Sequence, residues 1–335
     1  MIADAIAGIK LPEAGLSAEE VKKIVADAIA GIELPEAGLT ADEVADAIEA
    51  AIADLELGLS KEEVEALIKE ALEQLKEESS VENMIAAGKD VTLTEDYTVE
   101  GELIVPEDAS VVITLNGNNL AIDSTSKLAV YGTLTIVGGT VDASAGYDED
   151  YLDMGIVVED GGNLTVSDVT FNVTENGKWG LINEAGGTLT VKDCEFVMGD
   201  IANDSNPPAL LKNIGTAVVE NTTFTSTVAG VTEDDAVIVN FADLTLVNCT
   251  VNAAGICVAS RYNNPNATTT IIGGEYTTEF AQTSYTSAFY VFGGATLTLD
   301  DDVVINVPNA DHAPIYNDKL VPGTIVGNGY TVNVG

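Results

Sequence analysis

Leu164-Thr165-Val166-Ser167-Asp168-Val169-Thr170-Phe171 is the stretch that decides the fold, because its pattern recurs along most of the chain. Clear copies occupy residues 134–141, 189–196 and 244–251, and weaker copies start at Ala217, Thr269 and Leu297. Successive copies begin about 25 to 30 residues apart, a period that is typical of solenoid and propeller repeats.

Each copy has the pattern of a short strand, a bend and a second strand. Positions three and eight are apolar, and position one is apolar except at Thr269. Position five always holds a residue that favours turns, namely Gly138, Asp168, Asp193, Asn221, Asn248, Gly273 and Asp301. Such residues tolerate a left-handed backbone or bond their own main chain, so they predict a bend.

A second apolar run precedes most copies. These runs are residues 128–130, 156–158, 236–239, 256–258 and 288–291. Each period therefore holds two or three strands of about three to five residues. So few residues cannot bury a core alone, and we expect successive periods to stack.

The period is too short for a propeller blade, which needs about 40 residues, and it favours one coil of a parallel β-helix. The Leu-Thr-Val-x-Asp/Asn copies, together with Ile-Thr-Leu-Asn-Gly-Asn-Asn-Leu at 113–120, resemble the pectate-lyase-like β-helix proteins. This resemblance implies a mainly β chain with a right-handed parallel β-helix solenoid over residues 81–335. It implies little about activity, because the same scaffold serves lyases, hydrolases, adhesins and phage fibres.

The first 80 residues contain a different repeat. Residues 4–26 recur as 27–49, and a shortened third unit begins near Ala51. Three capping boxes predict helix starts, at Ser17 with Glu20, Thr40 with Glu43, and Ser60 with Glu63. We expect an α-helical stalk or anchor, because helices this short need a partner for their apolar stripes.

That partner is either the same helix in neighbouring chains or another helix of the same chain. Val64, Ile68, Ala71 and Leu75 are separated by steps of four, three and four, which is coiled-coil spacing. We therefore predict that residues 1–80 form an oligomerisation segment and that the chain is a homotrimer, with an intrachain bundle as the alternative.

The charge of the 335-residue chain limits its partners. It has 55 acidic and 13 basic residues and a net charge of −42. Such a chain repels phosphate, so nucleic acid and anionic membranes are not expected partners. Arg261 is the only arginine and His312 the only histidine, which leaves little for phosphate chemistry or histidine-based catalysis.

The cysteine positions argue against a disulfide framework, and the amino-terminal residues argue against export by the usual signal route. Cys194 and Cys249 occupy the same position of copies two rungs apart, about 9.6 Å, which is beyond disulfide reach. We expect these two and Cys257 to be small buried residues. The first residues lack the basic region and apolar run of a signal peptide, and no stretch is long enough to span a bilayer.

We predict no catalytic residue, no cofactor and no metal site. The acidic clusters, at residues 148–150 with Asp153, 233–235 and 300–302, lie in expected loops or turns. They do not match the Asn-x-Asp, Asp-Asp, Gly-His-Gly and Arg-x-Lys set of the polygalacturonase-like families. A calcium ion held by Asp148, Asp150 and Asp153 is the alternative to a solvated acidic loop.

The longer loops between strands are the better candidates for recognition. Tyr147, Tyr151, Trp179 and Tyr262 carry rings that can stack on sugars, and Arg261 lies beside the last of them. We predict host-glycan contact at these five residues, with loop anchoring as the alternative.

A cysteine-poor, acidic chain that joins a helical repeat to a β-helix is similar to phage head fibres. We therefore expect a structural virion protein, a head fibre or capsid-decoration fibre, that contacts a capsid or other virion protein. A bacterial surface adhesin and a polysaccharide-degrading tailspike are the alternatives.

Overall fold

The computed structural model describes residues 80–122, 125–143, 155–173, 180–198, 209–227, 236–261, 267–279, 287–309, 311–327 and 329–335. The chain divides into two units, Met1–Thr94 and Glu95–Gly335. The predicted helical repeat of residues 1–80 lies outside the described residues, except for Ser80. Among the described helices, none is long and apolar enough to cross a membrane.

The described part of the first unit begins with the short helix α5 (Val81–Ala86). Ser80 is its N-cap, since its hydroxyl oxygen accepts a hydrogen bond of 3.3 Å from the Asn83 N–H. Strand β1 (Val91–Thr92) follows.

The strands of the second unit form two parallel sheets, and the larger one bends at position five into two faces, which we call sheets 1 and 2. Together with the smaller sheet, sheet 3, each face receives one strand per turn of the chain. Sheet 1 contains β4 (Ser110–Thr114), the first half of β7 (Thr133–Ala143), the first half of β9 (Asn163–Val173), β11 (Thr188–Lys192), β14 (Thr216–Glu220), β17 (Asp243–Val247), β20 (Thr268–Ile272), β23 (Thr296–Leu299) and β26 (Thr324–Val326). Sheet 2 contains β2 (Tyr97–Val99), β5 (Asn119–Ile122), the second halves of β7 and β9, β12 (Glu195–Met198), β15 (Thr223–Ser226), β18 (Thr250–Ala253), β21 (Gly274–Thr278), β24 (Val303–Val307) and β27 (Thr331–Val334).

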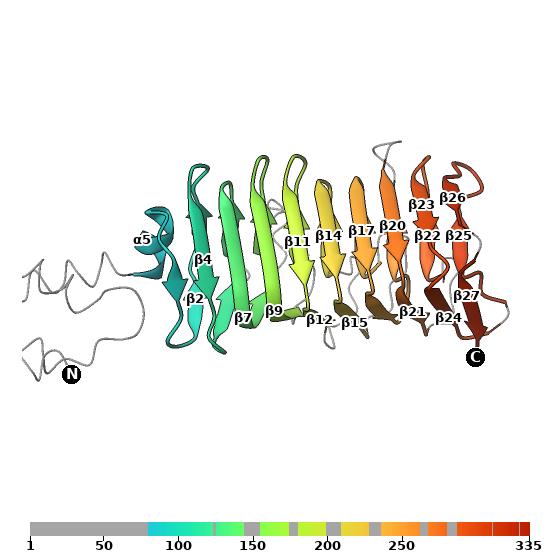
Figure 1. Ribbon diagram of the computed structural model, residues 1–335, viewed down its shortest axis with the longest axis horizontal. Coiled ribbons are helices and arrows are strands. Elements are labelled where there is room, and N and C mark those ends of the chain that lie inside the picture. Colours follow the sequence, from blue (N-terminus) through green and yellow to red (C-terminus); the bar gives the residue numbers. More distant parts are fainter. Residues whose placement is uncertain are drawn as a thin grey trace, which may run out of the picture. The chain divides into compact units, whose positions relative to one another are not determined.

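Sheet 3 contains nine strands in chain order. They are β3 (Glu102–Val105), β6 (Lys127–Val130), β8 (Gly155–Val158), β10 (Leu181–Asn183), β13 (Leu211–Asn213), β16 (Ile238–Asn240), β19 (Val258–Ser260), β22 (Phe289–Val291) and β25 (Ile315–Asn317). Every strand of this unit pairs in parallel with its equivalents one turn away, and Figure 1 shows the sheet 1 strands side by side in chain order. The predicted mainly β, parallel solenoid is confirmed.

The register confirms the repeat that the sequence predicted. Leu164 pairs with Leu134 on one side and Leu189 on the other, and Val166 pairs with Ile136 and Val191. Positions one and three of these copies are fully buried. Position eight forms a stack, in which the rings of Phe171, Phe196 and Phe224 have centroids 4.9 and 4.8 Å apart.

The bend at position five is also confirmed. Asp168, Asp193, Asn221 and Asn248 have φ between 49° and 54°, and Gly138 and Gly273 have φ of 66° and 64°. Only a few residue types accept this left-handed conformation, which explains the composition of the column. Asp301 lies in a turn without a left-handed φ. In β7 and β9 the bend falls inside one continuous strand, whereas we expected two strands there.

The three cysteines are buried, as predicted, and none forms a disulfide. Their thiols donate to main-chain carbonyls, for example Cys194 Sγ to Lys192 O at 3.1 Å and Cys249 Sγ to Val219 O at 3.4 Å. Burial raises the pKa of the Cys194 thiol and raises that of Cys249 to about 11. Cys194 and Cys249 therefore pack as small buried residues directly after the left-handed residue of the bend.

Candidate functional site

One row of side chains follows the corner where each sheet 3 strand ends. Its members, which we call the corner row, are Tyr131, Glu159, Glu184, Ile214, Phe241, Arg261, Phe292 and Asp318. Each main-chain N–H donates to the carbonyl of the last sheet 3 residue one turn earlier, from Glu184 to Val158 at 2.8 Å and from Arg261 to Asn240 at 2.8 Å. Corner-row side chains are therefore spaced by one rung, about 4.8 Å.

Buried asparagines hold this corner in place. Asn183, Asn213 and Asn240 are completely buried and stand directly before corner-row residues. The amide of Asn183 donates to Asn213 Oδ1 at 2.7 Å, and that of Asn213 donates to Asn240 Oδ1 at 2.8 Å. Asn240 continues the ladder by donating to Thr269 Oγ1 at 2.9 Å. A buried, connected network of this kind makes the corner rigid.

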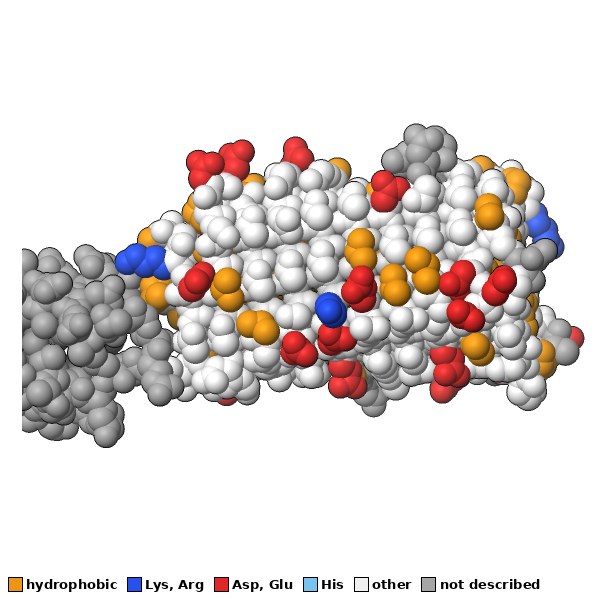
Figure 2. All heavy atoms as spheres, viewed as in Figure 1, with side chains coloured by type: hydrophobic (Ala, Val, Ile, Leu, Met, Phe, Trp, Pro, Cys, Tyr) orange, Lys and Arg blue, Asp and Glu red, His pale blue; other side chains and the backbone are white. Residues whose placement is uncertain are grey.

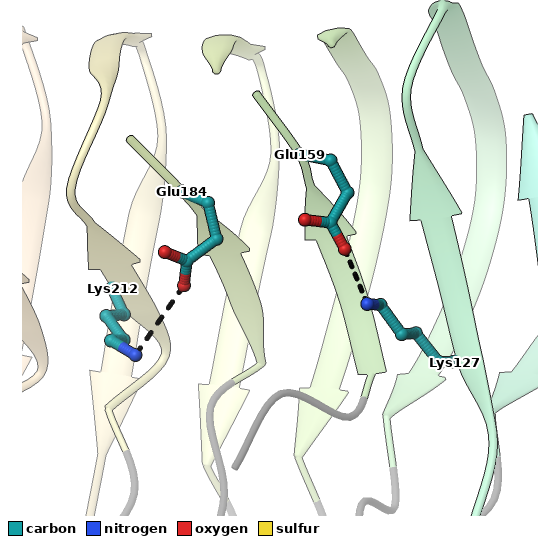
Figure 3. Close-up of polar contacts among 4 residues, drawn as sticks. All are labelled: Lys127, Glu159, Glu184 and Lys212. Carbon is teal, nitrogen blue, oxygen red and sulfur yellow. Dashed lines mark hydrogen bonds and ion pairs between the residues drawn. The ribbon is translucent and has the colours of Figure 1, made fainter. Parts of the chain in front are cut away.

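The first half of the corner row carries ion pairs. Glu159 pairs with Lys127 of β6, and Glu184 pairs with Lys212 of β13 at 3.7 Å, so each pair joins neighbouring rungs (Figure 3). Burial lowers the pKa of Lys127, but the hydrogen bond and charge of Glu159 outweigh this effect and the pKa is raised. Both lysines are therefore committed to intramolecular carboxylates.

The second half of the corner row contains two aromatic residues, Phe241 and Phe292, and the only arginine of the sequence. We call Phe241, Phe292 and Tyr316, together with Arg261, the aromatic patch. The guanidinium carbon of Arg261 lies 6.0 Å from the Phe241 ring centroid. Tyr290 stacks on Tyr316 at 5.4 Å and 5°, and its centroid lies 6.3 Å from that of Phe292.

The rings of the aromatic patch are anchored from below. Phe241, Phe292 and Tyr316 are partly exposed and pack on a buried cluster of Ala209, Ala236, Val239, Ile256, Ala259 and Tyr290. The Tyr290 hydroxyl donates to Asp318 Oδ2 at 3.3 Å. The pKa of Asp318 is lowered, chiefly because the main-chain N–H of Val321 donates to its carboxylate. Rigid rings beside a multivalent hydrogen-bond donor can stack on a sugar ring and bond its hydroxyls.

Of the residues predicted to contact glycan, the structure places Arg261 in this patch. Tyr147, Tyr151, Trp179 and Tyr262 lie outside the described residues. The acidic residues 148–150, Asp153 and 233–235 lie outside them too. Within the parts of the chain that the structure describes, no three His, Cys, Asp or Glu side chains are grouped as a metal site requires.

The sequence reasoning missed Phe241, Phe292 and Tyr316. A signal for the first two was present, because each directly follows the apolar run that becomes a sheet 3 strand, as Arg261 follows Ser260. Aligning the repeats on those runs would have placed Phe241, Arg261 and Phe292 in one row. The prediction instead fell on the longer loops, where aromatic residues are more conspicuous.

No family model matches the chain, and neither the curated proteins nor the solved structures that were searched include a match.

Proposed function

We propose that this chain is a structural virion protein, a phage head fibre or capsid-decoration fibre whose solenoid is the projecting body. The observation that carries the proposal is the uninterrupted stack in the second unit, where nine sheet 3 strands follow in chain order. Main-chain pairing and the asparagine ladder join each rung to the next, as a rigid spacer requires. The right-handed winding of the pectate-lyase-like proteins, a scaffold shared with phage fibres, belongs to the same proposal.

The acidic composition supports a protein displayed in many copies. A net charge of −42 produces repulsion between neighbouring fibres and from nucleic acid. Residues 1–80 supply the stalk, join three chains and attach them to a capsid or other virion protein. Light scattering of the full chain tests this part, and a stable monomer at micromolar concentration would contradict the trimer.

Contact with a host glycan is the second part of the proposal, and the aromatic patch is its site. Arg261→Ala and Phe292→Ala should each weaken binding to a responsive glycan on an array by about tenfold, because stacking area or a hydrogen-bond donor is lost. Tyr131→Ala is the matched control, since Tyr131 is an exposed corner-row aromatic outside the patch. Equal losses of glycan binding in all three variants would show that the aromatic patch is not the binding site.

Two other observations separate the alternatives. Release of reducing ends or unsaturated sugars from host capsule would favour a polysaccharide-degrading tailspike. A neighbouring gene for a sortase or a secretion system, in place of a major capsid gene, would favour a bacterial adhesin.

A further inference from the structure

The outer surface of sheet 1 carries a regular array of threonines. On seven consecutive strands, from β7 to β23, two outward residues flank the buried residue at position one of each copy, and eleven of these fourteen residues are threonine. We call the fourteen residues the threonine face. In pairs, strand by strand, they are Thr133 and Thr135, Asn163 and Thr165, Thr188 and Thr190, Thr216 and Val218, Asp243 and Thr245, Thr268 and Thr270, and Thr296 and Thr298.

Main-chain pairing arranges the threonine face in two continuous rows. Thr165 pairs with Thr135 on one side and with Thr190 on the other, and Thr270 pairs with Thr298. Neighbours in a row are one rung apart, about 4.8 Å, and the two residues of one strand are about 6.6 Å apart. Threonine is β-branched and has few χ1 values open to it. The hydroxyl and methyl groups therefore repeat in two directions with these spacings.

Strand propensity alone does not explain this array, because sheet 2 offers equivalent positions. On the same seven rungs, only six of the fourteen outward residues of sheet 2 are threonine, and three are acidic, namely Asp142, Glu195 and Glu275. Threonine favours strands in both sheets. The threonine face has one acidic residue, Asp243, which accepts a hydrogen bond of 2.7 Å from the Thr268 hydroxyl. Figure 2 looks onto sheet 1, and most of the surface there is white, the colour of side chains that are neither charged nor hydrophobic.

The backbone beneath the threonine face is fixed. The residues at position one, which separate the two rows, are buried on all seven strands. Each strand pairs with a neighbour on both sides, as β11 does with β9 and β14. The array is therefore a rigid net, which a repeating partner can match over many rungs without ordering the protein first.

The composition of the threonine face selects its partner. It has no aromatic ring to stack on a sugar, and it lacks the Tyr, Trp, Phe, Met and Arg that protein interfaces favour. Its hydroxyls can donate to and accept from water, while water beside the methyl groups must bond to other water. Such a surface orders water into a net of its own spacing. The oxygen atoms on a prism face of ice form a rectangular net whose two spacings are close to those of the threonine face.

We infer that the threonine face binds the surface of ice crystals. Water ordered by the two rows joins the lattice of the crystal, and the absence of charge along most of the face keeps that water from being oriented around ions. This activity uses neither the aromatic patch nor residues 1–80, so it is independent of the function proposed above.

The freezing behaviour of a solution of the full chain tests this inference. We expect the freezing point to fall below the melting point in the presence of a seed crystal, and we expect crystals with prism facets. Chain labelled with a fluorophore should be taken up into ice that grows slowly from its solution. A solution with no gap between freezing and melting, and ice that excludes the labelled chain, would overturn the inference. Binding to crystalline cellulose or chitin in place of ice would also overturn it.

Two double variants locate the surface. Thr190→Lys with Thr245→Lys should reduce the gap between freezing and melting by about tenfold, since two charges must lose water at the crystal surface. Both threonines are partly exposed, and circular dichroism checks that the variant is folded. Thr170→Lys with Thr225→Lys, on the outer surface of sheet 2, is the matched control and should keep the full gap. Equal losses in both variants would contradict the assignment. A lower mass of the first variant in sedimentation would show that the threonine face binds another copy of the chain instead.

Discussion

At the scale of the residue, the register rests on side chains such as Val166, which is completely buried. Val166→Asp places a carboxylate in the stack without a partner, and we expect a loss of about 3 to 5 kcal/mol in the free energy of unfolding. Urea denaturation followed by circular dichroism measures it. Thr165→Asp is the control, because Thr165 points outward and is partly exposed. Val166→Asp with unchanged stability would refute the register.

The bend column makes a different residue-scale prediction. Asn248 has a φ of 51°, and its N–H donates to Ile272 O at 2.8 Å. Asn248→Ala should lower the free energy of unfolding by about 1 kcal/mol, since alanine is strained in the left-handed region. Asn248→Gly should cost less, because glycine accepts this φ without strain. The reverse order in thermal or urea unfolding would show that the side chain, and not the backbone, determines the bend.

Cys249 gives the stability a dependence on alkaline pH. Burial raises its pKa from 9.0 to about 11, so the thiol stays protonated in the folded chain while the unfolded chain ionises. Its contribution to stability is therefore complete below pH 9 and is lost as pH rises toward 11. As the pH rises from 8 to 10, the free energy of unfolding of Cys249→Ala should fall by about 1 kcal/mol less than that of the unaltered chain. Equal losses, measured by urea unfolding, would show that Cys249 does not titrate in this way.

At the scale of the element, the asparagine ladder joins the sheet 3 strands through their side chains. Asn213 donates to Asn240 Oδ1, to Gly215 O at 3.2 Å and to Asp243 O at 3.0 Å. Asn213→Ala removes these hydrogen bonds from a buried network and also removes the Oδ1 that accepts from the Asn183 amide, and we expect a loss of about 3 kcal/mol in the free energy of unfolding. Thr190→Ala on the outer face of sheet 1 should change it by less than about 1 kcal/mol. A similar change in both variants would mean that the ladder adds nothing specific.

At the scale of the whole molecule, net charge opposes compaction. Folding brings the charges of a −42 chain closer together, so screening should stabilise the folded state. We expect the Tm of the full chain to rise from low salt to about 0.5 M sodium chloride, where the Debye length is only a few Å. Calorimetry measures the change, and a Tm that falls with salt would show that local ion pairs such as Lys212–Glu184 outweigh the overall repulsion.

Much of the solenoid could be predicted because its determinants are local. Leu164 and Val166 are apolar at alternate positions, and Asp168 marks a bend through its own backbone preference. Repetition then predicts that equivalent positions stack. Sequence patterns could not show that Asn183, Asn213 and Asn240 would be buried, since asparagine is usually a loop residue.

By itself, the sequence determined the period, the buried columns and the left-handed bends, because each depends on a residue and its close neighbours. Only the tertiary structure decided which side chains from different rungs meet. Phe241, Arg261 and Phe292 form one row because main-chain hydrogen bonds align strands that lie 20 and 31 residues apart in the sequence.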